Sequence, residues 1–194
     1  GRLMVNGKLC VSTEEGLDYL ASMAEAAGGL PYFRILQVNA AAFCNAGADI
    51  ATQLAYALSM ANEYMAQLAS RGVSPGLALS KTRFCFATGS DYFAEIARLR
   101  AARLLWANIA KAWDPGNDEN CRMKIHCVTG DWNKTTFDPY VNMLRTQTEA
   151  MSAILGGTDS LTVSPFDEVF RKTDEFSERI ARNQQLILKE ESYF

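Results

Sequence analysis

Short runs of β-branched and aromatic residues alternate along the chain with longer segments in which apolar residues recur three or four positions apart. The short runs predict strands at residues 8–11, 32–38, 83–87, 122–128 and 160–163. The longer segments predict helices at residues 12–28, 49–70, 96–113, 137–151 and 175–190. The predicted strands and helices therefore alternate along the whole chain.

Capping and breaking residues set the limits of several helices. Ser12 with Glu15 three residues later is typical of a capping box at a helix start. Gly72 and Pro75 are expected to stop the alanine-rich helix that precedes them. The sequence Asp114-Pro115-Gly116 ends the next one.

Strands followed by helices, repeated at roughly 40 to 50 residues, indicate about five parallel βα units and an α/β fold class. Two architectures satisfy this pattern: an open doubly wound sheet, and part of an eight-fold barrel. No G-x-G-x-x-G follows any strand, which disfavours a dinucleotide-binding version of the first. A complete barrel typically needs about 250 residues, so the pattern alone leaves closure open.

One strand carries a polar face. Alternation along residues 122–128 puts Arg122, Lys124 and His126 on one side and apolar residues on the other. Strands of parallel sheets are usually apolar on both faces. The polar face therefore indicates either a wet, lined interior or an edge strand with a solvated face.

Composition and charge exclude several partners. The net charge is −3 and the pI is near 5.3, so we expect neither nucleic acid nor an anionic membrane as a partner. No apolar run reaches membrane-spanning length and no signal peptide opens the chain. Because the sequence begins at Gly1 and not at Met, we expect a piece of a longer protein.

The cysteines and the histidine argue against a metal site. Five cysteines, an odd number without a C-x-x-C pair, suit reduced thiols in the cytoplasm. His126 is the only histidine, and no Cys/His spacing repeats, so no metal is expected.

No catalytic motif stands out from the residues themselves. The chain has neither a G-x-S-x-G elbow nor a P-loop, and a lone histidine such as His126 is more typical of a structural residue. The basic cluster Arg98, Arg100 and Arg103 is expected to be a helix face or a subunit contact and not an anion site.

Several stretches, in order, resemble the methylmalonyl-CoA mutase family. The first, Arg98-Leu99-Arg100-Ala101-Ala102, lies inside the resembling segment 97–107, and His126 begins the next, which is similar to the family's H-x-Q-T-S-G-W. The remaining stretches carry Arg145-Thr146, Glu149-Ala150-Met151 and the Gly156-Gly157 pair, and the last spans residues 177–185. The resemblance covers most of the chain.

The resemblance implies a partial TIM-type (β/α)8 barrel of about five βα units, with residues 1–194 forming a single segment of that domain. In the family a flavodoxin-like cobalamin domain with a D-x-H-x-x-G motif follows the barrel, and we expect neither in this chain. Family members interconvert methylmalonyl-CoA and succinyl-CoA with adenosylcobalamin, and the substrate's pantetheine arm runs along the barrel axis.

Departures from the family's pattern bear on catalysis. Ala41 and Ala42 occupy the positions of the Tyr-His pair in the family's S-G-Y-H-x-x-x-A-G stretch, and a methyl group can neither hydrogen-bond a carbonyl nor steer a radical. Val128 replaces the family's glutamine, and Lys124 stands where catalytic chains have arginine, without its bidentate grip. Glu149, in the family's cobalamin-facing E-A pair, is kept.

This pattern is that of the small, non-catalytic subunit of heterodimeric bacterial mutases. We therefore expect no catalytic residue in this chain, and cofactor-facing positions at His126 and Glu149 that are vestigial. The large catalytic subunit is the expected partner and holds adenosylcobalamin in the holoenzyme, so no cofactor is expected in this chain. The alternative is an active acyl-CoA mutase of altered substrate specificity. Because an incomplete barrel leaves open sheet edges, the fragment is also expected to self-associate.

Overall fold

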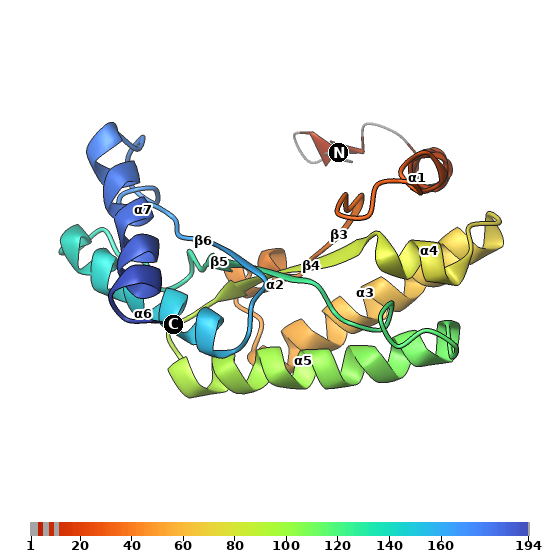
Figure 1. The fold of residues 1–194 in the computed structure, drawn as a ribbon. Helices are drawn as coiled ribbons and strands as arrows, with labels where there is room; N and C mark the ends of the chain where they lie inside the picture. The colour runs from red at the N-terminus through yellow and green to blue at the C-terminus, as the bar shows by residue number, and fades with distance from the viewer. Residues whose placement is uncertain (1–3, 6–7, 10–11, 194) are drawn as a thin grey trace.

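A four-stranded parallel sheet forms the centre of the protein (Figure 1). It is seen in a computed structural model that describes residues 4–5, 8–9 and 12–193. The strands follow one another across the sheet in chain order. They are β3 (Leu36–Asn39), β4 (Thr82–Thr88), β5 (Ile125–Thr129) and β6 (Ser160–Thr162).

Helices connect these strands. The described helices are α1 (Thr13–Ala26), α2 (Ala41–Asn45), α3 (Ile50–Ser70), α4 (Pro75–Ser80), α5 (Tyr92–Trp113), the 3₁₀ turn η1 (Pro139–Val141), α6 (Asn142–Leu155) and α7 (Glu175–Glu190). Helices α3 and α5 run side by side beneath the sheet in Figure 1, and α6 packs next to α5.

The strand order decides between the two architectures that the sequence left open. A doubly wound sheet reverses its strand order and carries helices on both faces. Here the order is sequential, and the main core joins the sheet to α3, α5 and α6 on one face. The α/β fold class is confirmed, and its arrangement is that of a partial (β/α) barrel.

Large side chains of the strands fill the space between the sheet and these helices. Phe84 and Phe86 of β4 point into this layer with Met123 and Ile125, and all four are almost fully buried. The edge of the Trp106 ring of α5 meets Phe84 with 4.9 Å between centroids. Aromatic pairs of this geometry contribute about 0.5–1.5 kcal/mol beyond their buried area.

The face of the sheet opposite this layer carries polar positions. Gln37, Asn39 and Arg83 are exposed there, and His126 is half-buried. Of the predicted polar face of the third strand, only His126 lies within β5, because Arg122 and Lys124 precede it. Strand β5 lies between β4 and β6, so the explanation of its polar face as an edge strand is wrong.

The first predicted strand has a different place from the one expected. Lys8–Leu9 (β2) pairs antiparallel with Met4–Val5 (β1), outside the parallel sheet, while Cys10 and Val11 lie outside the described residues. Four of the roughly five expected strands therefore form the parallel sheet that the structure describes.

Two strands begin later than predicted, and two short helices, α2 and α4, were not foreseen. The predicted strands at 32–38 and 122–128 begin only at Leu36 and Ile125. Pro75 starts the short helix α4 instead of only marking a stop, since the first helical turn tolerates proline. Among the other predicted helices, α5 begins earlier than expected, at Tyr92, and α6 both begins and ends later, at Asn142 and Leu155.

Candidate functional site

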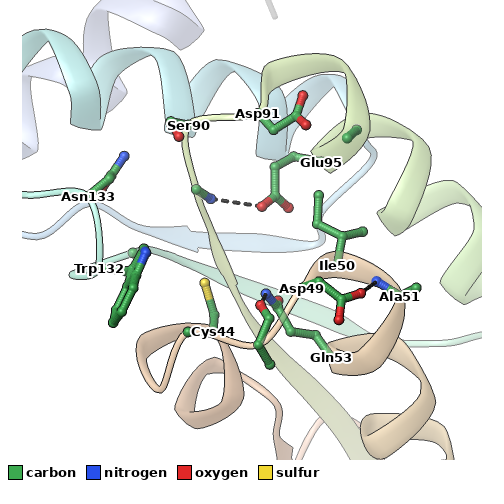
Figure 2. A pocket seen from close by; sticks show the side chains of 15 residues that line it. Cys44, Asp49, Ile50, Ala51, Gln53, Ser90, Asp91, Glu95, Trp132 and Asn133 are labelled. Atoms are coloured by element: carbon green, nitrogen blue, oxygen red, sulfur yellow. Dashed lines mark hydrogen bonds between the residues drawn. The ribbon is translucent and has the colours of Figure 1, made fainter.

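The loops at the carboxyl ends of the strands surround a cavity of about 560 Å³ (Figure 2). Its lining comes from the segment between β3 and α3, the β4–α5 turn and the β5–α6 loop. In parallel α/β folds this end of the sheet is where ligands bind. Cys44, Glu95 and Trp132 border the cavity from three different connections.

Ala41 and Ala42 lie at the start of α2, directly after β3. Ala41 is 8% exposed and belongs to a small apolar cluster with Cys44, Cys85 and Ala87. Ala42 faces solvent. The position that the resemblance assigned to a tyrosine is therefore a packing position here, with no polar group to offer.

His126 is held on this polar face of the sheet by hydroxyl groups of β6. Its Nδ1 lies 2.8 Å from the Ser160 Oγ, and its Nε2 lies 3.4 Å from the Thr162 Oγ1. Burial lowers the pKa of His126, and the Arg83 guanidinium lowers it further. Among the described hydrogen bonds, none joins this ring to a carboxylate. The arrangement lacks the acid that orients a catalytic histidine.

Glu149 of α6 is completely enclosed. The Lys134 Nζ lies 2.7 Å from each of its two carboxylate oxygens, and the Asn133 amide donates to Oε1 at 2.6 Å. Burial raises the pKa of Glu149, and the Lys134 ammonium opposes that shift. Burial lowers the pKa of Lys134, which the Glu149 carboxylate in turn opposes.

The structure does not bring His126 and Glu149 into one network. The partners of His126 are on β6, whereas those of Glu149 are on the loop after β5. The side chain of Glu149 has no exposed surface, and internal donors occupy both of its oxygens. The described residues around Glu149 thus leave neither carboxylate oxygen free for a cofactor.

A second buried ion pair beside the cavity was missed from the sequence. Arg98 and Glu95 of α5 contact each other, and Arg98 also donates to the Gln53 side chain and, at 2.6 Å, to the Ala87 carbonyl. The Gly89 N–H donates to Glu95 at 2.9 Å (Figure 2). Burial raises the pKa of Glu95, and Arg98 opposes this. The spacing of three residues on one helix was the available signal.

This pair corrects the expectation for the basic cluster. Arg98 is buried and serves neither an open helix face nor a subunit contact. Arg103 donates to the Met123 carbonyl at 2.7 Å and lies 3.1 Å from Asp159, so it joins α5 to the starts of two strands. Arg100 stays exposed and donates to the Leu155 carbonyl at 3.3 Å.

In the described part of the chain, no group of three or more histidine, cysteine or acidic side chains is placed to hold a metal ion. Within the same residues, no helix combines the length and the apolar character needed to cross a membrane. Cys44, Cys85, Cys121 and Cys127 are free thiols, and burial raises the pKa of Cys127 to about 11.

Comparison with known proteins gives consistent matches. The family model for methylmalonyl-CoA mutase matches residues 1–194. The chain is 48% identical over 185 residues to the methylmalonyl-CoA mutase small subunit of Porphyromonas gingivalis, covering 95% of this chain and 30% of that protein. It is 36% identical over 190 residues to the methylmalonyl-CoA mutase of Rhizobium meliloti, covering 97% of this chain and 27% of the relative.

The human protein named methylmalonyl-CoA mutase, mitochondrial, is 36% identical over 195 residues, covering 97% of this chain and 26% of the relative. The chain thus spans less than a third of the length of these relatives. The match of the family model along the whole chain, together with the sequential parallel sheet, settles its ancestry. The chain belongs to the methylmalonyl-CoA mutase family.

Proposed function

We propose that this chain is a barrel segment of the small, non-catalytic subunit of a heterodimeric methylmalonyl-CoA mutase. The complete enzyme interconverts methylmalonyl-CoA and succinyl-CoA in the cytoplasm, and its large subunit holds adenosylcobalamin and substrate. One observation carries the proposal. Ala41, at the position where the family's pattern has a tyrosine, packs into an apolar cluster after β3 and offers no reacting group. The pairing of Glu149 with Lys134 adds to it.

The similarity to a protein named as a small subunit supports this assignment. A small subunit implies a large one, so the proposed partner is a catalytic mutase subunit. The proposed role of this chain in that complex is to stabilise its partner. The buried free thiols support a reducing compartment.

The test uses the full-length protein, alone and combined with its large subunit. Conversion of methylmalonyl-CoA in the presence of adenosylcobalamin is measured for both samples. We expect turnover by the complex and none by this protein alone. His126→Ala in this chain should leave kcat and KM of the complex unchanged, because its partners are hydroxyls of the same chain. Turnover by the protein alone at the rate of the complex would contradict the proposal.

The second candidate is an active acyl-CoA mutase with altered substrate specificity. The cavity of about 560 Å³ and the retained His126 favour it. An active mutase chain must bind adenosylcobalamin itself, whereas the proposed non-catalytic subunit need not. Titration of the full-length protein with adenosylcobalamin, followed by the visible spectrum of the cobalamin, should show no binding under the first proposal. Tight binding would favour the second.

We also infer that the segment of residues 1–194, prepared by itself, associates with further copies. Strands β3 and β6 have no outer neighbour in the described part of the sheet, and such edges pair readily. Light scattering should give a mass that rises with protein concentration. A monomer at all concentrations would contradict this inference.

A further inference from the structure

The contact between Lys134 and Glu149 satisfies the donors of the ammonium group completely. An ammonium has three donors. The Lys134 Nζ has three acceptors: the two Glu149 oxygens at 2.7 Å and the Asn133 Oδ1 at 3.0 Å. The side chains of Lys134 and Glu149 are only 3% and 0% exposed. The pair is therefore closed to water as well as to other groups.

This network ties a loop to a helix. Asn133 and Lys134 belong to the loop after β5, whereas Glu149 lies in the middle of α6. Asn133 takes part twice, because its amide donates to Glu149 while its carbonyl accepts from Lys134. Loop residues at the cavity are thus positioned by an internal ion pair.

We infer that Lys134 is an internal counter-ion that occupies Glu149 in place of any external ligand and closes this carboxylate to a cofactor or a substrate. The description of this closure as the loss of a cofactor contact rests on the proposed function. The ion pair itself does not.

The free energy needed to displace Lys134 should keep Glu149 paired with it. A ligand that bound Glu149 would leave the ammonium without its carboxylate in a buried site, and an unpaired buried charge is strongly unfavourable. The alternative is to pull the loop away from α6, which also breaks the bonds of Asn133. Lys134 belongs to the same chain as Glu149, so its contact loses none of the translational and rotational entropy that a separate ligand would lose on binding.

A surface pair in the same chain provides a matched control. Lys189 and Glu190 of α7 contact each other at 3.0 Å, but their side chains are 76% and 63% exposed. The charged groups are the same and the distance is similar. The two pairs differ in burial and in the number of acceptors around the ammonium, so Lys134 should react more slowly than Lys189.

The experiment measures amine acetylation by N-hydroxysuccinimidyl acetate on the full-length protein, with peptide mass spectrometry as the readout. We expect Lys134 to react at least about tenfold more slowly than Lys189, because acetylation needs an accessible, neutral amine. Glu149→Gln should speed the reaction of Lys134, and Glu190→Gln should leave that of Lys189 unchanged. Equal rates for Lys134 and Lys189 in the wild-type protein would overturn the inference, even if Glu149→Gln fails to fold.

Adenosylcobalamin provides the second arm. Adding it should leave the acetylation rate of Lys134 unchanged. Faster acetylation in its presence would mean that an outside group displaces the ammonium, which would overturn the inference. Neither arm measures turnover. A failure of the proposed function, seen as mutase activity of the protein alone, is therefore distinguishable from a failure of this inference.

Discussion

Asn45 and Asp131 exchange two hydrogen bonds, although they are 86 residues apart in the sequence. The Asn45 amide donates to the Asp131 carboxylate at 2.7 Å, and the backbone N–H of Asp131 donates to the Asn45 Oδ1 at 3.1 Å. The end of α2 is thereby joined to the loop after β5. Together with the Lys134–Glu149 pair, this contact fixes that loop from two sides.

Removing the Asn45 side chain should cost more stability than removing that of Asp131. Asn45→Ala deletes both hydrogen bonds, whereas Asp131→Ala deletes only the bond to its carboxylate. At about 0.5–1.5 kcal/mol for each bond, we expect losses of about 1–2 and about 1 kcal/mol in the free energy of unfolding. Urea denaturation measures both, with exposed Asn183→Ala as the control. A larger loss for Asp131→Ala would contradict the assigned bonds.

A second substitution tests the contact between Trp132 and the turn after α2. Gly47 has a φ of 87°, and a Cβ at this position would lie 3.1 Å from the Trp132 ring. Gly47→Ala should therefore add a steric cost to backbone strain of about 1–2 kcal/mol. It should also change the fluorescence of the exposed Trp132.

A substitution at Gly72 separates the backbone strain from the steric clash. Its φ is 86°, but nothing lies within 4 Å of a Cβ there. Gly72→Ala should show the strain alone and leave tryptophan fluorescence unchanged. Equal losses in the free energy of unfolding for the two variants would mean that the Trp132 ring does not clash with a Cβ at position 47.

His126 should make the stability depend on pH. Its pKa in the folded protein lies below the ordinary value of 6.5. As the pH falls through 6.5 towards the folded pKa, the unfolded chain takes up a proton that the folded protein does not, so the free energy of unfolding falls. Above 6.5 this contribution is fully present. Between about pH 8 and pH 5 the wild type should lose more stability than His126→Gln, as measured by urea denaturation at each pH. Parallel curves for the two proteins would contradict the lowered pKa.

Local signals were enough to predict most of the fold. The capping box of Ser12 and Glu15 forms as expected, and α7 spans the predicted residues 175–190. Periodicity reports the burial of a helix or strand face, and it therefore located the elements well. The prediction was wrong for residues 32–35, which have the composition of a strand but precede β3. The first backbone bonds to the neighbouring segment are those of the Ile35 and Leu36 N–H groups, which both donate to the Lys81 carbonyl.

The site was less predictable, because its contacts depend on the relative placement of elements. The two alanines could be found by resemblance, but the burial of Ala41 against Cys85 depends on how α2 folds back over β4. Ser160 could not be assigned to His126 without the register of β5 and β6. The closure of Glu149 needed the path of an irregular loop, for which the sequence has no periodic signal.

A tyrosine placed at the first of the two alanines tests the proposal that packing has closed this position to a reacting side chain. Ala41 contacts the Cys44, Cys85 and Ala87 cluster and is almost buried, so Ala41→Tyr should overpack it. Overpacking of a close-packed site costs about 1–3 kcal/mol.

Ala42→Tyr is the matched control, since the same side chain one position later faces solvent and should change the free energy of unfolding by no more than about 0.5 kcal/mol. Urea denaturation compares the two variants. A stable Ala41→Tyr protein would show that the space for a reacting tyrosine still exists, and the loss of that group would then be a matter of chemistry alone. An unstable one would mean that the neighbouring side chains have closed over the position, so that a single substitution cannot rebuild a catalytic site there.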